Sequence, residues 1–152
     1  MARLLVVDDD EIIRGMLAFL FEGEGYLVEQ AEDGADALDR LRQGDRFDCI
    51  ILDLMMPGVD GLTVLRVRQQ ERLAADTRVV VLTAKAGSDD ALWCWEAGAD
   101  DYVSKPFEPD LLLRTVHELA GLSPEEAARR RDVGVAEARR QEAFDALLRA
   151  RD

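Results

Sequence analysis

Apolar runs alternate along the chain with segments in which apolar residues recur every three or four positions. The runs indicate β-strands near residues 3–8, 26–30, 48–53, 78–82 and 101–104. The helical spacing occurs near residues 11–22, 34–43, 61–72, 88–97 and 108–120. The runs at 48–53 and 78–82 are almost continuously apolar, as in strands that helices cover on both faces. The pattern therefore predicts an α/β fold with a doubly wound, five-stranded parallel sheet in the order 2-1-3-4-5 and helices on both faces.

The pattern changes after this first domain, which we place at residues 1–121. Ser123 and Glu126 have the spacing of a helix-capping box, and the residues that follow are rich in Ala, Arg and Glu. Residues 122–152 are therefore predicted to form a helical tail or linker, which Gly134 is expected to interrupt at a cost of about 1 kcal/mol relative to Ala. The tail fits a linker to a further output domain, a dimerising helix, or a helix that folds back.

Chemically reactive side chains stand at the ends of four predicted strands. Asp8 and Asp9 follow the first strand, Asp53 ends the third, Thr83 ends the fourth and Lys105 follows the fifth. The carboxyl ends of parallel strands share one edge of the sheet, where ligands bind. Clustered carboxylates suit Mg²⁺, and a carboxylate beside a cation and a lysine suits capture of a phosphoryl group. The sequence thus predicts a magnesium-dependent phosphoryl site.

Charge and hydropathy exclude other classes of function. The 152-residue chain has a net charge of −13, and the acidic excess lies in the first domain because acidic and basic residues are balanced in the tail. A nucleic-acid-binding surface needs a basic patch, so we expect no direct nucleic acid binding by this chain. No apolar run approaches the roughly 18 residues of a membrane span, and the chain enters a strand at once, without a secretory signal. We therefore expect a cytoplasmic protein with no membrane partner.

Four motifs carry a resemblance to a known family. They are Leu-Val-Val-Asp-Asp at 5–9, Leu-Asp-Leu-Met-Met-Pro-Gly at 52–58, Leu-Thr-Ala at 82–84 and Gly-Ala-Asp-Asp-Tyr-Val-Ser-Lys-Pro-Phe at 98–107. Together they resemble the receiver domain of two-component response regulators, over about residues 2–121. The resemblance implies a flavodoxin-like fold and a signalling role: a phosphoryl group passes from a histidine kinase or phosphotransfer protein to an aspartate. Such a domain is a phosphoacceptor, not an enzyme beyond its own phosphorylation and dephosphorylation.

The resemblance also assigns roles to the strand-end residues. Asp53 would be the nucleophile that accepts the phosphoryl group. Asp8, Asp9 and Asp53, together with the backbone carbonyl of Met55, would hold Mg²⁺. Lys105 would place its ammonium group on a phosphoryl oxygen.

Further positions would govern the conformational switch and the lifetime of the phosphoryl group. Thr83 would bind another phosphoryl oxygen through its hydroxyl group, and Tyr102 would rotate inward behind it as the second part of the switch. Met55 and Lys85 would flank the path of attacking water and so set the lifetime of the phosphoryl group.

The surface that partners read in this family is commonly formed by helix 4, strand 5 and helix 5. One subfamily places basic residues on those helices that pair with acids across a dimer; here Asp100 and Asp101 are present, but the basic positions are not. Trp93 stands where the family is usually polar, which makes it an interface candidate for a homodimer or a downstream output domain. Trp95 stands at a usually buried position, so we expect it in the core.

Two alternative functions remain open at this level. The run from Asp8 to Ile12 is similar to the signature of haloacid-dehalogenase-type phosphatases, and Asp8 would then be the nucleophile. That class needs room for a cap domain, which the compact core lacks, and it leaves the Asp53 motif without a role. A phosphorylation-independent scaffold of receiver shape is the other alternative, although the intact set of acids, Thr83 and Lys105 argues against it.

Overall fold

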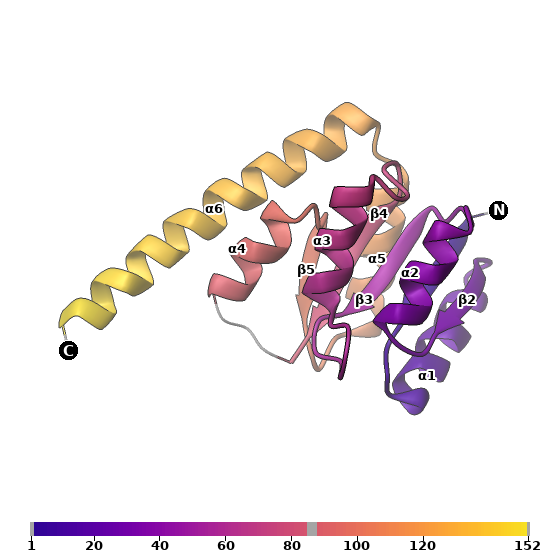
Figure 1. Ribbon diagram of the computed structural model, residues 1–152. Helices are drawn as coiled ribbons and strands as arrows, with labels where there is room; N and C mark the ends of the chain where they lie inside the picture. Colours follow the sequence, from indigo (N-terminus) through magenta and orange to yellow (C-terminus); the bar gives the residue numbers. More distant parts are fainter. Residues whose placement is uncertain (1, 85–87, 152) are drawn as a thin grey trace.

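The computed structural model describes residues 2–84 and 88–151 (Figure 1). The strands are β1 (Arg3–Val7), β2 (Leu27–Ala31), β3 (Cys49–Asp53), β4 (Arg78–Thr83) and β5 (Asp101–Ser104). The helices are α1 (Glu11–Glu22), α2 (Gly34–Arg42), α3 (Gly61–Glu71), α4 (Ser88–Glu96), α5 (Pro109–Ala120) and α6 (Pro124–Arg151). Strands and helices alternate up to α5, as the apolar pattern predicts.

All five strands are parallel, in the order β2-β1-β3-β4-β5. This order confirms the predicted flavodoxin-like sheet. The register pairs Val7 with Leu52 on one side of β3, and Asp53 with Leu82 on the other. The ends of β1, β3 and β4 are therefore level, and the residues that follow them meet at a single edge.

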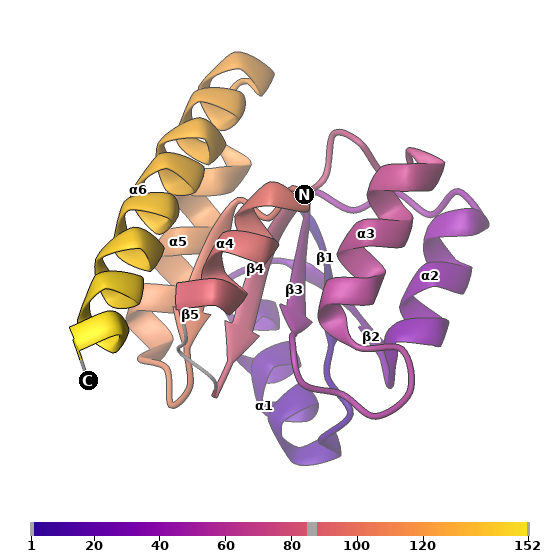
Figure 2. The same ribbon diagram turned by 60° about the vertical axis from the view of Figure 1, so that its left-hand side comes forward.

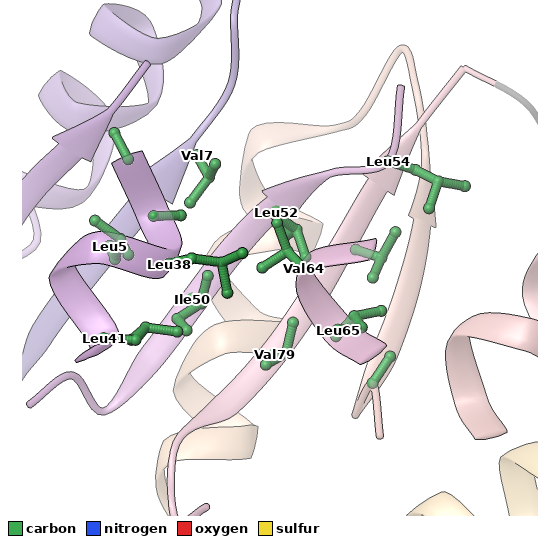
Figure 3. Packing of buried hydrophobic residues seen from close by; sticks show 14 of the residues in the cluster. Leu5, Val7, Leu38, Leu41, Ile50, Leu52, Leu54, Val64, Leu65 and Val79 are labelled. Carbon is green, nitrogen blue, oxygen red and sulfur yellow. The ribbon is translucent and has the colours of Figure 1, made fainter. Parts of the chain in front are cut away.

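Helices cover both faces of the sheet and bury alternate strand residues. One cluster joins the strands to α2, α3 and α4, and Figure 3 shows part of it: Leu5, Val7, Leu38, Leu41, Ile50, Leu52, Leu54, Val64, Leu65 and Val79. The opposite cluster joins the intervening strand residues to α1 and α5, through Leu17, Phe21, Leu112, Val116 and Leu119. Each large apolar side chain buried here contributes about 1.5–3 kcal/mol to the free energy of folding before entropic costs. The sheet is thus held in position by a hydrophobic cluster on each of its faces.

Aspartates begin the helices that follow the central strands. The Asp10 carboxylate accepts hydrogen bonds from the backbone N–H groups of Ile12 and Ile13, and the Asp60 carboxylate accepts one from Thr63. These caps satisfy donors that the first helical turn leaves without partners. The two caps therefore fix where α1 and α3 begin after β1 and β3.

The tail forms one helix that folds back beside α4 (Figures 1 and 2). Ser123 caps its start: the Ser123 hydroxyl accepts from the N–H of Glu126, whose carboxylate accepts from the N–H of Ser123. The expectation that Gly134 interrupts this helix is wrong, because α6 continues through it. A Cβ atom at Gly134 would lie 2.5 Å from Cε3 of Trp95, so the glycine allows α6 to approach the indole ring of α4. Among the described residues, no helix combines the length and hydrophobicity needed to cross a lipid bilayer.

Candidate functional site at the carboxyl edge of the sheet

Three carboxylates meet where β1 and β3 end. One carboxylate oxygen from each of Asp8, Asp9 and Asp53 lies within 4.8 Å of the other two. Asp8 and Asp53 are buried, whereas Asp9 is exposed to solvent. Hard oxygen donors at this spacing, with one side open to water, fit Mg²⁺, which binds through a few carboxylates and keeps several water ligands. The donor set thus fits the metal that the sequence predicts.

Lys105 reaches into this cluster from the end of β5. Its Nζ lies 3.1 Å from Oδ2 of Asp8 and 3.5 Å from Oδ1 of Asp53. Its backbone N–H donates to the carbonyl of Thr83 at 2.7 Å, which fixes the end of β5 against the end of β4, and the Lys105–Pro106 peptide bond is cis. The ammonium group therefore offsets part of the repulsion between the two buried carboxylates.

The ionisation of Asp53 reflects this environment. Burial raises the pKa of Asp53 to about 6, and the charge of Asp8 adds to the increase. Lys105 and the backbone N–H of Met55, which donates to Oδ1 of Asp53 at 3.2 Å, act in the opposite direction. A carboxylate with a raised pKa is more basic than an ordinary aspartate, and a nearby cation favours its charged form. Asp53 is thus a deprotonated, partly desolvated carboxylate at neutral pH.

Backbone groups hold the two buried carboxylates in place. The N–H of Asp10 donates to Oδ1 of Asp8 at 2.9 Å, and Arg14 donates to the backbone carbonyl of Asp8 at 2.8 Å. Gly61 packs directly on the end of β3: a Cβ atom there would lie 2.4 Å from the carbonyl oxygen of Asp53 and 2.8 Å from Cα of Leu54. Neither Arg14 nor Gly61 is marked as a site residue by the sequence pattern. The Asp60-Gly61 pair signals a turn, but nothing local shows that the turn lies against the strand end.

The predicted switch residues lie on β4, which pairs with β3, and on β5, which pairs with β4. Thr83 is fully buried at the end of β4, and it pairs with Ser104 of β5. Tyr102 pairs with Val81 and is half-buried beside α4. Burial raises the pKa of Tyr102 to about 12, with smaller contributions from Cys94 and Asp90 of α4. The phenol of Tyr102 therefore lies between the sheet and α4, next to the strand that carries Thr83.

The remaining predicted residues differ in their surroundings. The Met55 side chain is 56% exposed beside the carboxylates, and Lys85 lies outside the described residues. Trp93 is 46% exposed on α4, and its role at an interface stays a prediction. Trp95 is half-buried, and α6 covers its ring, so the expectation that it belongs to the core is only partly met.

Comparison with known proteins gives the family of this fold and site. Residues 4–117 match the model of the response regulator receiver domain. The chain belongs to the response regulator receiver family. A curated relative, protein PetR of Rhodobacter capsulatus, is 43% identical to this receiver over 123 residues, which cover 81% of this chain and 50% of PetR. The DNA-binding response regulator MtrA of Mycolicibacterium smegmatis is 41% identical over 134 residues, covering 87% of this chain and 56% of MtrA. The receiver chain thus spans about half the length of these relatives.

Solved structures agree with this assignment. The structure of response regulator TrrA from Thermotoga maritima, in complex with Mg²⁺ and BeF, superposes on this receiver with a TM-score of 0.69 at 38% sequence identity. The match covers 78% of this chain and 99% of TrrA. The sheet, α1 to α5 and the edge with the carboxylates therefore form a receiver, and α6 is an addition to it. The receiver assignment also leaves the phosphatase alternative without support.

Proposed function

We propose that residues 1–121 are a phosphoacceptor domain in which Asp53 takes a phosphoryl group from a histidine kinase or a phosphotransfer protein. The observation that carries the proposal is the convergence of Asp53 with Asp8, Asp9 and Lys105 at one sheet edge. A carboxylate oxygen of Asp53 attacks the phosphorus atom, and the bond from phosphorus to the donor imidazole nitrogen breaks. The electron pair of that bond stays on the imidazole. The domain acts as a substrate with self-catalysed transfer, not as an enzyme for other substrates.

Mg²⁺ is the proposed cofactor, held by Asp8, Asp9, Asp53 and the backbone carbonyl of Met55. When bound, such an ion supplies positive charge to the phosphoryl oxygens. Asp8 and Asp9 provide most of the negative charge that retains it. The exposure of Asp9 leaves room for water on the solvent side, and hydrogen bonds from the Asp10 N–H and from Lys105 hold the buried carboxylate of Asp8 in place.

Lys105 and Thr83 are proposed to bind the remaining phosphoryl oxygens. Lys105 already contacts the carboxylate that becomes phosphorylated, so its ammonium group needs only a small movement. Thr83 follows the residue that pairs with Asp53 in the sheet. We propose that Tyr102 moves toward Thr83 in response, which shifts the populations of two states of the α4–β5 region.

The partners follow from this role. A histidine kinase or phosphotransfer protein supplies the phosphoryl group, and the receiver acts on an output domain or on a second copy of itself. MtrA is named a DNA-binding response regulator, so we propose that any contact with DNA belongs to an output domain and not to this acidic chain. The proposed location is the cytoplasm.

The decisive test is phosphorylation by a small donor. The protein is incubated with acetyl phosphate and Mg²⁺, and its intact mass and the modified peptide are determined. We expect one phosphoryl group on Asp53, none in Asp53→Asn, and unchanged labelling in the control Asp39→Asn, which alters an exposed aspartate of α2. Labelling of Asp8, or one phosphoryl group that persists in Asp53→Asn, would show that the nucleophile is wrongly assigned.

The lifetime of the phosphoryl group gives a second test of the site. Met55 is exposed beside Asp53, and we propose that it and Lys85 control access of water. Met55→Asn and Lys85→Glu should alter the rate of dephosphorylation while still permitting phosphorylation. Equal decay rates in the parent and both variants would exclude this control.

A further inference from the structure

Small residues of α6 allow it to pack closely against α4. Ala127, Gly134 and Ala138 are the buried residues of α6, and their spacing of seven and four places them on one side of the helix. Gly134 lies against the six-membered ring of Trp95, where even a methyl group would overlap the ring. A large side chain on this side of α6 would push the two helices apart. The fit therefore depends on a small residue opposite a tryptophan.

Ion pairs align α6 at the start of β5. Nη2 of Arg130 lies 2.6 Å from Oδ2 of Asp101, and Nη1 of Arg131 lies 2.7 Å from Oδ1 of Asp100. Asp100 is buried, and its other carboxylate oxygen accepts a hydrogen bond from the N–H of Val79 at 2.8 Å. The sequence offers these two aspartates no basic partners at the positions expected on helices 4 and 5. The structure supplies both from the tail of the same chain.

The surface that α6 covers is connected to the phosphoryl site through β5 and α4. Tyr102 follows Asp101 directly, and its side chain packs against the buried cluster that includes Cys94 of α4. α4 in turn carries Trp95, which α6 contacts. A movement of Tyr102 toward Thr83 would remove part of the support beneath α4. Since the Trp95–Gly134 contact has no spare room, a small displacement of α4 would disturb it.

We propose that the α4–β5 face is a docking site for a helix that bears two arginines and a small residue. α6 fills this site within the same chain, and phosphorylation of Asp53 releases α6 from it. The inference rests on the proposed function, because the trigger is the phosphoryl group on Asp53. Release of α6 exposes Trp95, Asp100 and Asp101 together. The coupling is reciprocal: if a ligand at the phosphoryl site lowers the docking equilibrium constant of α6 by some factor, docked α6 lowers the affinity for that ligand by the same factor.

The first experiment measures docking in the full chain by hydrogen exchange of α6 amides. Mg²⁺ and beryllofluoride, a phosphoryl mimic, should speed exchange in residues 124–142 of the parent but not of Asp53→Asn. Arg130→Ala/Arg131→Ala should exchange rapidly in this segment without the mimic. The matched control Arg129→Ala/Arg140→Ala changes two exposed arginines of the same helix and should behave like the parent.

The second experiment measures the reciprocal effect as the affinity for beryllofluoride in the presence of Mg²⁺, by titration calorimetry. Arg130→Ala/Arg131→Ala and Gly134→Leu should bind it more tightly than the parent, by about 5- to 150-fold, the usual range for coupled sites. Leucine favours a helix more than glycine does, so Gly134→Leu disturbs docking without melting α6. The Arg129→Ala/Arg140→Ala control should keep the affinity of the parent.

The outcomes separate the two levels of the proposal. Equal affinities in all variants, together with unchanged α6 exchange when the mimic is bound, would overturn the coupling and leave the phosphoacceptor role intact. Rapid exchange of α6 in the untreated parent, equal to that of the double arginine variant, would overturn docking itself. Absence of any Asp53-dependent binding of the mimic would overturn the proposed function and the inference together.

Discussion

Asp53→Asn should make the protein more stable at neutral pH in the absence of Mg²⁺. In the folded chain, burial and Asp8 raise the pKa of Asp53 to about 6 from an ordinary value of 3.8. The folded state therefore holds this proton more strongly than the unfolded state, and stability falls as the pH rises from about 4 through about 6. The difference between the two values corresponds to a loss of about 3 kcal/mol above that window. Asparagine keeps an acceptor for the N–H of Met55 and removes the charge.

The assay is urea unfolding without metal ions at about pH 3 and about pH 7.5, on either side of the titration. At the higher pH, Asp53→Asn should gain about 2–3 kcal/mol in the free energy of unfolding, and at the lower pH it should gain almost nothing. Asp39→Asn, the exposed control, should change little at either pH. Saturating Mg²⁺ should narrow the gap at the higher pH, because an ion that binds only the folded parent stabilises it by mass action.

Two results would refute this reasoning. An equal gain at both pH values would mean that the asparagine improves packing and not electrostatics. A loss of stability at the higher pH would mean that the ion pair with Lys105 outweighs burial and the repulsion from Asp8, so that the charged carboxylate stabilises the fold.

Three further predictions concern the edge and the tail. Asp9→Ala should abolish the rise in melting temperature that Mg²⁺ produces, and a rise equal to that of the parent would exclude Asp9 as a ligand. Gly61→Ala should cost about 3 kcal/mol or more in urea unfolding, because its Cβ would overlap the backbone at Asp53; a change within about 0.5 kcal/mol would mean that α3 shifts freely. Ser123→Ala should remove the cap of α6 and cost about 1 kcal/mol, seen as faster exchange of the first turn of α6 with an unchanged Mg²⁺ response, and unaltered exchange would show that the cap is dispensable.

Sequence pattern predicted the sheet well because the central strands carry an unambiguous signal. β3 and β4 are buried throughout and mostly apolar, since helices cover both of their faces, and their ends are marked by Asp53 and Thr83. Parallel topology then brings Asp8 and Lys105 to the same edge, although they are far apart in the chain. The functional roles of these residues remain predictions, whereas their proximity is a feature of the fold.

The position of the tail could not be predicted from the same signals. The buried residues of α6 are two alanines and a glycine, so they form no stripe of large apolar side chains that would indicate a packed face. Helix propensity marks Gly134 as a weak point, whereas in the fold it is the residue that admits Trp95. The pairs of Arg130 and Arg131 with Asp101 and Asp100 join segments about 30 residues apart and leave no periodic trace in the sequence.

Because α6 is long, a small movement near its start becomes a larger movement at its far end. Its 28 residues form a rod of about 42 Å, at 1.5 Å per residue. The ion pairs with Asp100 and Asp101 hold this rod near its first turns, while the exposed Phe144, Leu147 and Leu148 belong to its last turns. A tilt of about 10° at the base would carry that far end through roughly 7 Å. Gly134 stands about 15 Å from that base, so a displacement beside Trp95 becomes about three times larger at the tip, as in a lever.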